Sequence, residues 1–201
     1  IFVELEAIHL QTLEKVCFRK EQCGFGYRDS IFKSTEKNRY FIISVTVRLQ
    51  KKPMYQVAYG DIQSVLQKDF DGVISIKNIS DAVIQIRKSK LPDPDQLGNA
   101  GSFFKNPIIT VKQADELSTQ FPEMPRHQVE NGIKIPAAWL IEQCNWKGHT
   151  AGKYGVHTKQ ALVLVNYKDA KGSDILALSE EIITTVQQRF NIHLEREVNI
   201  W

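Results

Sequence analysis

Residues 98–107, GNAGSFFKNP, combine a flexible start with a rigid end. The glycines free the backbone, whereas the closing proline restricts it. The pattern predicts a tight turn that leads into a strand, with Phe103 and Phe104 in the core. The glycines also allow a ligand to approach the backbone beside Ser102 and Asn106, so these polar side chains are candidate site residues. The stretch lacks the GK[ST] ending of a P-loop, so a loop of that type is not indicated.

On the N-terminal side of this stretch, alternating apolar residues predict strands. In residues 2–7 (FVELEA) the apolar Val3 and Leu5 share one face, and residues 39–49 (RYFIISVTVRL) alternate in the same way. A loop rich in glycine and aromatic residues, CGFGYRDSIFK, lies between them and returns the chain to the sheet. These segments predict an antiparallel sheet.

The second half of the chain mixes helical periodicity with short apolar runs, which predicts an α+β fold. Pro92 and Pro94 interrupt regular structure, and a domain boundary is expected there. The expected helices cover residues 80–90 with Ser80 as N-cap, residues 114–121, a segment that starts at Pro136, and a long segment capped by Ser173. The expected strands cover residues 161–166 (ALVLVN) and residues 193–200 (HLEREVNI).

The composition is that of an ordinary globular protein. The 201 residues are 42% hydrophobic and 24% charged, with a net charge of +3. No run of apolar residues is long enough for a transmembrane helix, and no run of Lys or Arg favours nucleic acid. Three cysteines without a CxxC motif suggest a reduced, intracellular protein. The histidines have no metal-binding spacing, so no metal site is expected. The opening IFVELEAI reads as a strand within a protein rather than a signal peptide.

Three groups of polar residues have both a functional and a structural interpretation. Arg28 suits two-pronged capture of a carboxylate, but its spacing equally fits a surface pair with Asp29. Glu197 lies on the polar face of the last expected strand, where pattern alone favours a solvent-facing residue. The glycine-rich loop at residues 147–160 offers lysines and histidines for phosphate, or it is simply a solvated basic loop.

The order of the motifs resembles the UDP-N-acetylenolpyruvoylglucosamine reductase (MurB) family over essentially the whole chain. The matching motifs are FGYRDSIFK, YGD at residues 59–61, KLPDP at residues 90–94, GNAGSFFKNP, AAWLIEQC, HTKQALVLVN and the closing LEREV. GSFFKNP together with YRDSIFK is the most specific combination. The YGD segment is similar to the type I form of the family, which covers its substrate with a tyrosine loop.

The resemblance implies a cytoplasmic enzyme of peptidoglycan precursor synthesis and cell wall biogenesis. With FAD and NADPH, such an enzyme reduces UDP-N-acetylglucosamine enolpyruvate to UDP-N-acetylmuramate, and no nucleic acid or membrane partner is implied. Hydride passes from NADPH through flavin N5 to the substrate. Ser102 would supply the proton, with help from Lys105 or Asn106. Arg28 and Glu197 would be the other catalytic residues. The implied substrate contacts are Tyr27, Tyr59, Lys90, Asn106 and Gln160, with Lys147 a further match.

Two departures from the family bear on the architecture. No segment matches the family's first flavin-binding lobe, and Arg196 stands where the closing glutamate motif usually has proline. The chain is therefore expected to contain part of the second FAD-binding lobe (residues 1–90), a substrate-binding domain (residues 91–188) and a strand returning to the lobe (residues 189–201). FAD-contacting residues stay unassigned. The alternative is an inactive module that binds a UDP-sugar, and a basic nucleic-acid-binding domain is disfavoured.

Overall fold

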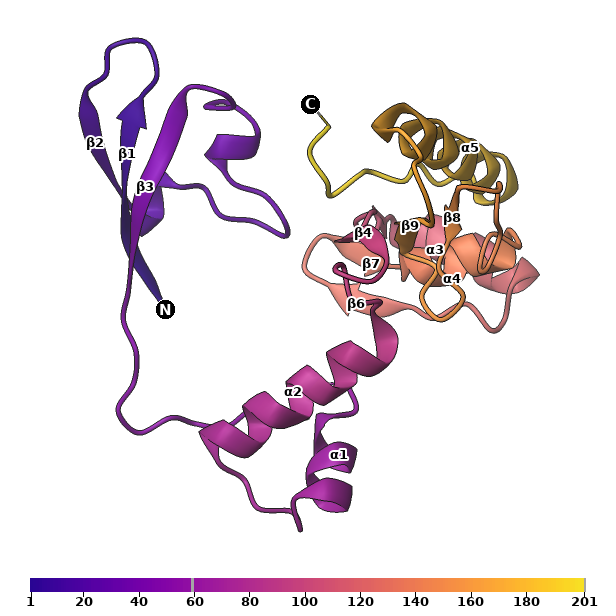
Figure 1. Ribbon diagram of the computed structural model, residues 1–201, viewed down its shortest axis with the longest axis horizontal. Helices are drawn as coiled ribbons and strands as arrows, with labels where there is room; N and C mark the ends of the chain where they lie inside the picture. The colour runs from indigo at the N-terminus through magenta and orange to yellow at the C-terminus, as the bar shows by residue number, and fades with distance from the viewer. Residues whose placement is uncertain (59, 201) are drawn as a thin grey trace. The chain divides into compact units, whose positions relative to one another are not determined.

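The structure is a computed structural model that describes residues 1–58 and 60–200, so the predicted contact residue Tyr59 lies outside the described residues. The chain divides into two compact units, unit 1 (Ile1–Tyr55) and unit 2 (Gln56–Trp201). Antiparallel sheets and helices alternate along the chain, which confirms the predicted α+β class (Figure 1). Among the described residues, no helix is long and apolar enough to cross a membrane.

Unit 1 is built on an antiparallel sheet of three strands in the order β2-β1-β3. Its elements are β1 (Phe2–His9), β2 (Lys15–Arg19), β3 (Tyr40–Val47) and two short 3-10 helices at Lys20–Gln22 and Ile31–Lys33. Leu5, from the predicted apolar face of residues 2–7, packs with Ala7 and Cys23 in a small core. Phe18 and Tyr40 extend this core through an edge-on ring contact, with centroids 4.9 Å apart.

The outer strand β3 of unit 1 carries exposed apolar side chains. Phe41, Ile43 and Val45 are 62, 43 and 53% exposed. Among the described residues β3 pairs only with β1, so its other edge also presents unpaired backbone groups. An apolar strand with an open edge is a surface that proteins normally cover with another element.

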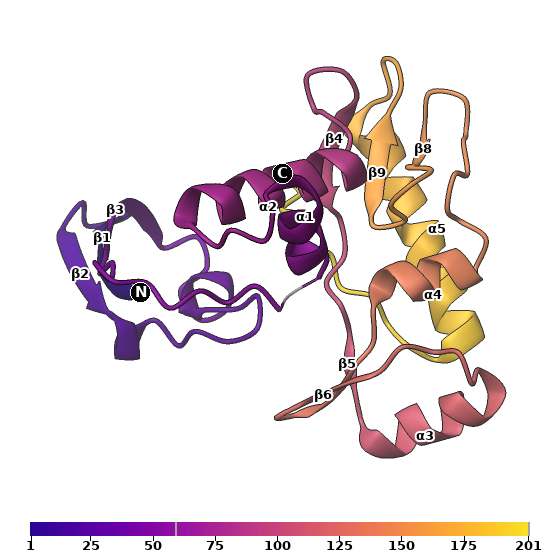
Figure 2. The same ribbon diagram turned by 90° about the horizontal axis from the view of Figure 1, so that it is seen from below.

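Unit 2 contains two antiparallel sheets, β4-β9-β8 and β5-β7-β6. The strands are β4 (Gly98–Ser102), β5 (Ile108–Ile109), β6 (His127–Val129), β7 (Gly132–Lys134), β8 (Tyr154–Val156) and β9 (Val163–Asn166). The helices are α1 (Ile62–Asp69), α2 (Ile76–Lys90), α3 (Val111–Gln120), α4 (Ala137–Gln143) and α5 (Gly172–Phe190). α5 packs against α4, β8 and β9, and Figure 2 shows it behind these strands.

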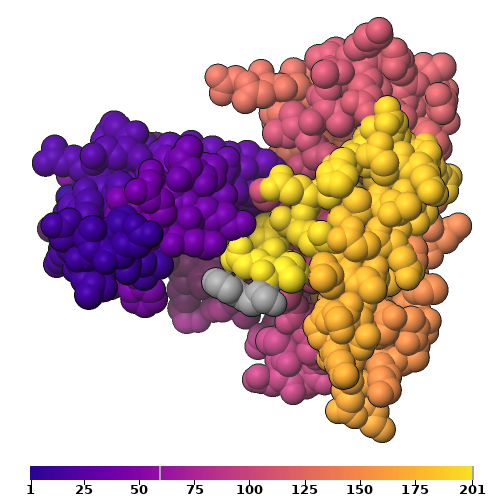
Figure 3. Space-filling view, turned by 90° about the horizontal axis from the view of Figure 1, so that it is seen from above, coloured from indigo at the N-terminus to yellow at the C-terminus, as the bar shows by residue number. Residues whose placement is uncertain are grey.

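The core of unit 2 lies between α5 and the β4-β9-β8 sheet. β9 is the central strand, and Val163 and Val165 are fully buried while Leu164 is 2% exposed. A strand covered on both faces explains the continuous apolar run predicted for residues 161–166. The buried residues of α5, Ile182 among them, recur at the expected helical spacing. The opposite face of α5 and the segment after it form part of the molecular surface (Figure 3).

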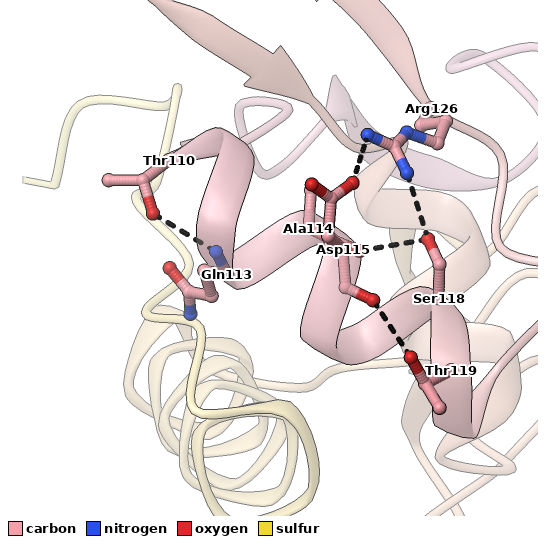
Figure 4. A network of polar contacts seen from close by, with 7 residues as sticks. All are labelled: Thr110, Gln113, Ala114, Asp115, Ser118, Thr119 and Arg126. Atoms are coloured by element: carbon pink, nitrogen blue, oxygen red, sulfur yellow. Dashed lines mark hydrogen bonds and ion pairs between the residues drawn. The ribbon is translucent and has the colours of Figure 1, made fainter.

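Three predicted helix starts are wrong, because each helix begins before the residue at which the prediction placed its start. α2 begins at Ile76 rather than after Ser80, because Ser75 accepts a hydrogen bond from the Asn78 N–H at 3.1 Å. α5 begins at Gly172, and Ser173 lies inside it rather than at the cap. α3 begins three residues earlier than predicted, after the Thr110 cap (Figure 4).

The strand predicted for residues 193–200 is wrong within the described part of the chain. The segment contains one isolated bridge, between Arg196 and Phe104, and is otherwise irregular. Its first apolar residue, Leu194, is fully buried, whereas Ile200 is 53% exposed. The predicted assignment of residues 1–90, 91–188 and 189–201 to functional domains stays a prediction.

The buried stripe of α5 should dominate the stability of unit 2. Ile182→Ala removes a fully buried side chain, so we expect a loss of about 2–5 kcal/mol of unfolding free energy. Glu181→Ala, at an exposed position on the same helix, should change it by less than about 0.5 kcal/mol. Urea unfolding followed by tryptophan fluorescence measures both, and equal losses would contradict the packing described.

Candidate functional site

Ser102 ends β4 on a β-bulge. The register of β4 against β9 shifts between Asn99 and Ser102, and Gly101 adopts a φ of 69°, which residues with a side chain rarely adopt. Asn99 Oδ1 accepts a hydrogen bond from the Gly101 N–H at 3.0 Å and stabilises this bend. Ser102 is exposed, whereas the next residues, Phe103 and Phe104, are only 4 and 1% exposed. Their predicted place in the core is confirmed, and they anchor the exposed hydroxyl.

Glu197 lies on the segment that pairs with the residues after Ser102. The Glu197 N–H donates to the Phe103 carbonyl at 2.9 Å, and the Lys105 N–H donates to the Glu195 carbonyl at 2.8 Å. In this antiparallel arrangement Glu197 lies opposite Phe103, the immediate neighbour of Ser102. The structure thus places two of the predicted catalytic residues on adjacent backbone segments, although they are far apart in the sequence.

The side chain of Lys105 takes part in the same pairing. Its ammonium group forms an ion pair with the Glu195 carboxylate, and the lysine side chain is only 16% exposed. The Glu195 side chain is 68% exposed, so water screens part of this attraction. The pair therefore ties the serine-bearing segment to the glutamate-bearing segment and places a positive charge close to both.

Asn106 supports α4. Its Oδ1 atom accepts a hydrogen bond from the Ala137 N–H, the first amide of α4, at 2.9 Å. Helix-start amides have no partner within the helix, so this bond satisfies a group that otherwise needs water. The carboxamide oxygen of Asn106 is thus engaged in the structure, and its NH2 group carries the donors that a ligand would use.

Lys90 lies at the end of α2 and pairs with the aspartate of the YGD motif. Lys90 Nζ is 2.6 Å from Asp61 Oδ2, and the two side chains are 52 and 60% exposed. Water screens an ion pair of this exposure, so it contributes little to stability. An incoming phosphate could therefore replace the carboxylate at low cost.

The basic loop before β9 is more ordered than a solvated loop. Gln160 is half-buried, and its Oε1 accepts a weak hydrogen bond from the Leu162 N–H at 3.4 Å. Lys147 pairs with Glu142 at 2.9 Å. Burial, and secondarily the charge of Lys159, lowers the pKa of His157. In residues 1–58 and 60–200 no group of three potential metal ligands is found.

Tyr27 and Arg28 belong to unit 1, whereas the other described site residues belong to unit 2. Both are exposed, and Arg28 adopts a φ of 56°. A positive φ is uncommon for a residue with a long side chain and often marks a functional turn. The turn is held locally, because the Lys33 ammonium donates to the Arg28 carbonyl at 3.1 Å and Asp29 Oδ1 accepts from the Ser30 N–H at 2.8 Å.

Sequence reasoning missed the partners that hold these residues. Asp61, Glu195 and Glu180 were not singled out, although each pairs with a basic residue in or beside the site. The motif YGD drew attention to the segment that holds Asp61. The closing LEREV motif likewise contains Glu195, but no sequence pattern indicated Glu180.

These features define an α+β protein in which an exposed serine at the end of β4 is followed by residues that pair with a glutamate-bearing segment. The family model described as "UDP-N-acetylenolpyruvoylglucosamine reductase, C-terminal domain" matches residues 93–201. The chain belongs to this family, which confirms the resemblance based on the motifs.

Similar proteins agree with this assignment. The chain is 50% identical over 201 residues to the UDP-N-acetylenolpyruvoylglucosamine reductase of Amoebophilus asiaticus, covering 100% of this chain and 59% of that protein. It is 47% identical to the protein of the same name from Flavobacterium johnsoniae, covering 99% of this chain and 60% of that protein. The chain thus spans about three fifths of the length of these relatives.

Among solved structures, the fold is similar to that of UDP-N-acetylenolpyruvylglucosamine reductase (MurB) from Thermus caldophilus. The TM-score is 0.57 at 20% identity, and the match covers 100% of this chain and 53% of that chain. At this identity the likeness supports the fold alone.

The contact between Asn106 and α4 predicts that two substitutions differ. Asn106→Ala removes the acceptor of the Ala137 N–H and should cost about 1 kcal/mol of unfolding free energy. Asn106→Asp keeps an oxygen at this position and adds a negative charge that a helix start favours, so it should cost less. Urea unfolding of both variants tests this, and equal losses would show that the hydrogen bond does not stabilise α4.

Proposed function

We propose that this chain supplies the substrate-facing residues of a UDP-N-acetylenolpyruvoylglucosamine reductase. The reaction is the reduction of UDP-N-acetylglucosamine enolpyruvate to UDP-N-acetylmuramate with FAD and NADPH, in cytoplasmic peptidoglycan precursor synthesis. The observation that carries the proposal is the exposed Ser102 hydroxyl on the β4 bulge, beside the segment that bears Glu197. Membership of the family supports the same reaction.

The described residues fit FAD in part. Unit 2 offers a proton donor with a carboxylate on the adjacent segment, and unit 1 offers the exposed apolar strand β3, which fits a sheet shared with further flavin-binding residues. We assign no residue to the flavin itself. When bound, FAD would carry the hydride from NADPH to the enolpyruvyl double bond.

Ser102 is the proposed proton donor to the carbon next to the substrate carboxylate. Hydride addition at the far carbon of the double bond leaves enolate character, and this character is removed by protonation. A serine hydroxyl is a weak acid, so a neighbouring positive charge is needed to favour the ionised state. Lys105, three residues after Ser102 and with a side chain that is only 16% exposed, supports this role.

Arg28 and Glu197 have separate proposed roles. Arg28 would bind the substrate carboxylate, where a planar guanidinium makes two parallel hydrogen bonds and stabilises charge that grows in the transition state. Glu197 would act with Ser102 during proton transfer. Its half-buried position favours a fixed orientation over a solvated one.

The proposed binding residues would recognise different parts of the UDP-sugar. Lys90 would bind phosphate, because its ammonium group is exposed and its pair with Asp61 is weak. Asn106 would donate from its NH2 group, and Gln160 from its own NH2 group. Tyr27 would contact the substrate, and Tyr59 would close over it.

A second candidate function is that these 201 residues bind the UDP-sugar without catalysing its reduction. The open apolar strand β3 favours this alternative, because it indicates that unit 1 lacks part of its cover. Substrate binding would then rest on unit 2, which has its own core.

Ser102→Ala should separate the two half-reactions of a complete, flavin-loaded reductase. Reduction by NADPH should stay within about twofold, whereas the half-reaction with the enolpyruvyl substrate should slow by about 100-fold or more, because only that half needs the proton. Ser173→Ala, at an exposed serine on α5, is the matched control. Stopped-flow flavin absorbance measures both steps, and equal slowing of the two would exclude Ser102 as the proton donor.

The 201-residue chain itself should be colourless and inactive, with weak affinity for UDP-N-acetylglucosamine enolpyruvate. Calorimetric titrations with that compound and with FAD test the two halves of this expectation. Lys90→Ala should weaken the UDP-sugar response, because it removes the proposed phosphate contact. Tight, stoichiometric FAD binding would contradict the predicted architecture.

A further inference from the structure

Arg196 lies directly before Glu197, and the two side chains project from opposite faces of the backbone. Arg196 pairs with Phe104, and the backbone hydrogen bonds on either side of this pair involve the flanking residues, so it is a non-hydrogen-bonded pair. Opposed residues of an antiparallel pair project to the same face, and Phe104 is buried in the core that α5 covers. Arg196 therefore faces α5, whereas Glu197 projects from the other face.

α5 binds the Arg196 guanidinium at two points. Nε donates to Ser179 Oγ at 2.8 Å, and Nη2 lies 2.5 Å from Glu180 Oε1. Ser179 is fully buried, and its own hydroxyl donates to the Leu176 carbonyl at 2.7 Å, which leaves the oxygen as an acceptor for Arg196. The arginine side chain is only 22% exposed. We call these two contacts the clamp. Its Ser179 point is shielded from water, because Ser179 is fully buried. Its Glu180 point is a partly solvated ion pair, because the Glu180 side chain is 60% exposed.

We infer that Arg196 is a positioning residue. By binding α5, its side chain holds the local backbone in place and so fixes the orientation of the next residue, Glu197. The inference rests on the role proposed above for Glu197. Within the described residues, the segment that bears Glu197 contains one isolated bridge. A bridge without a continuing ladder leaves the backbone free to twist, and the clamp on the opposite face removes that freedom.

The backbone geometry at residue 196 also identifies a rescue substitution. In a non-hydrogen-bonded pair the N–H of Arg196 points away from the strand opposite it. A proline at this position would therefore break no bond of the pairing, and its ring would restrict the backbone directly. A side-chain clamp and a proline ring are two ways to limit the same motion, so Arg196→Pro should replace the clamp.

The test uses the complete, flavin-loaded reductase and stopped-flow measurement of both half-reactions. Arg196→Ala should slow the half-reaction with the enolpyruvyl substrate about tenfold, because a catalytic group is misplaced. The half-reaction with NADPH should stay within about twofold. Arg196→Pro should return the rate of the half-reaction with the enolpyruvyl substrate to within about threefold of the parent rate.

Arg196→Ala in a Glu197→Gln background tests whether Arg196 acts through Glu197. If Arg196 acts through Glu197, Arg196→Ala should add less than about twofold there, since coupled residues are not additive. A purely structural effect would instead persist in both backgrounds and slow both half-reactions. Hydrogen exchange of the Glu197 amide, which bonds the Phe103 carbonyl, should quicken in Arg196→Ala and return in Arg196→Pro.

Arg126, which lies directly before β6 and binds two residues of α3, provides a matched control. Its guanidinium binds a carboxylate and a serine hydroxyl, as Arg196 does: Nη2 lies 2.8 Å from Asp115 Oδ1 and Nη1 lies 3.3 Å from Ser118 Oγ (Figure 4). Arg126→Ala removes the same kind of contact from a helix that does not bear the clamp. Both half-reaction rates should stay within about twofold of the parent.

Each result decides the inference. A tenfold loss that vanishes in the Glu197→Gln background and is rescued by proline supports it. A loss of equal size in both backgrounds, or no loss where Glu197→Gln itself has an effect, overturns it. If Glu197→Gln has no effect, the proposed role of Glu197 fails, and unchanged amide exchange in Arg196→Ala would then overturn the positioning as well.

Discussion

The candidate site of unit 2 depends on the pairing of residues 103–105 with residues 195–197. Two backbone hydrogen bonds and one ion pair join these segments, and the phenylalanines of the first segment are buried in the core. Hydrogen bonds shielded from water in this way gain strength from the low dielectric around them. The same residues that fill the core thus determine where the exposed serine and the late glutamate lie.

Local sequence patterns predicted the parts of the fold that local physics controls. The apolar run before α5 corresponds to a strand covered on both faces, and the helical stripe of α5 is buried as expected. The start of α2 was wrong because Ser75 and Ser80 can both cap a helix, and the sequence does not show which will do so. The start of α5 was wrong because the Asp174 carboxylate, rather than Ser173, accepts a hydrogen bond from an amide at the helix start, the Lys171 N–H. The alternation in residues 193–200 suggested a strand, but a ladder needs a partner of matching length, which is a tertiary property.

The identities of the site residues followed from motifs, whereas their partners did not. The resemblance to the reductase family pointed to Ser102 and Glu197, and the structure places both on adjacent segments. The contact between Asn106 and the first amide of α4 joins distant parts of the chain, so no spacing rule predicts it. Arg28 was equally compatible with a surface pair and with ligand capture, because a single arginine carries no information about its environment.

The proposed binding residues of unit 2 already have partners in the chain. The burial of each contact distinguishes those that support the structure from those that a ligand can replace. Lys90 and Asp61 are both more than half exposed, so exchanging the carboxylate for a phosphate changes their hydration little. The oxygen of Asn106 accepts a hydrogen bond from a helix amide that has no partner within the helix, so a ligand can use only the NH2 group without a cost in stability. Arg196 differs from Lys90, because its contact with Ser179 is buried and lies on the face away from Glu197, although its other partner, Glu180, is 60% exposed. The shielded polar contacts, such as that between Arg196 and Ser179, therefore fix the geometry of the site. The exposed contacts, such as that between Lys90 and Asp61, are the ones that a ligand can replace.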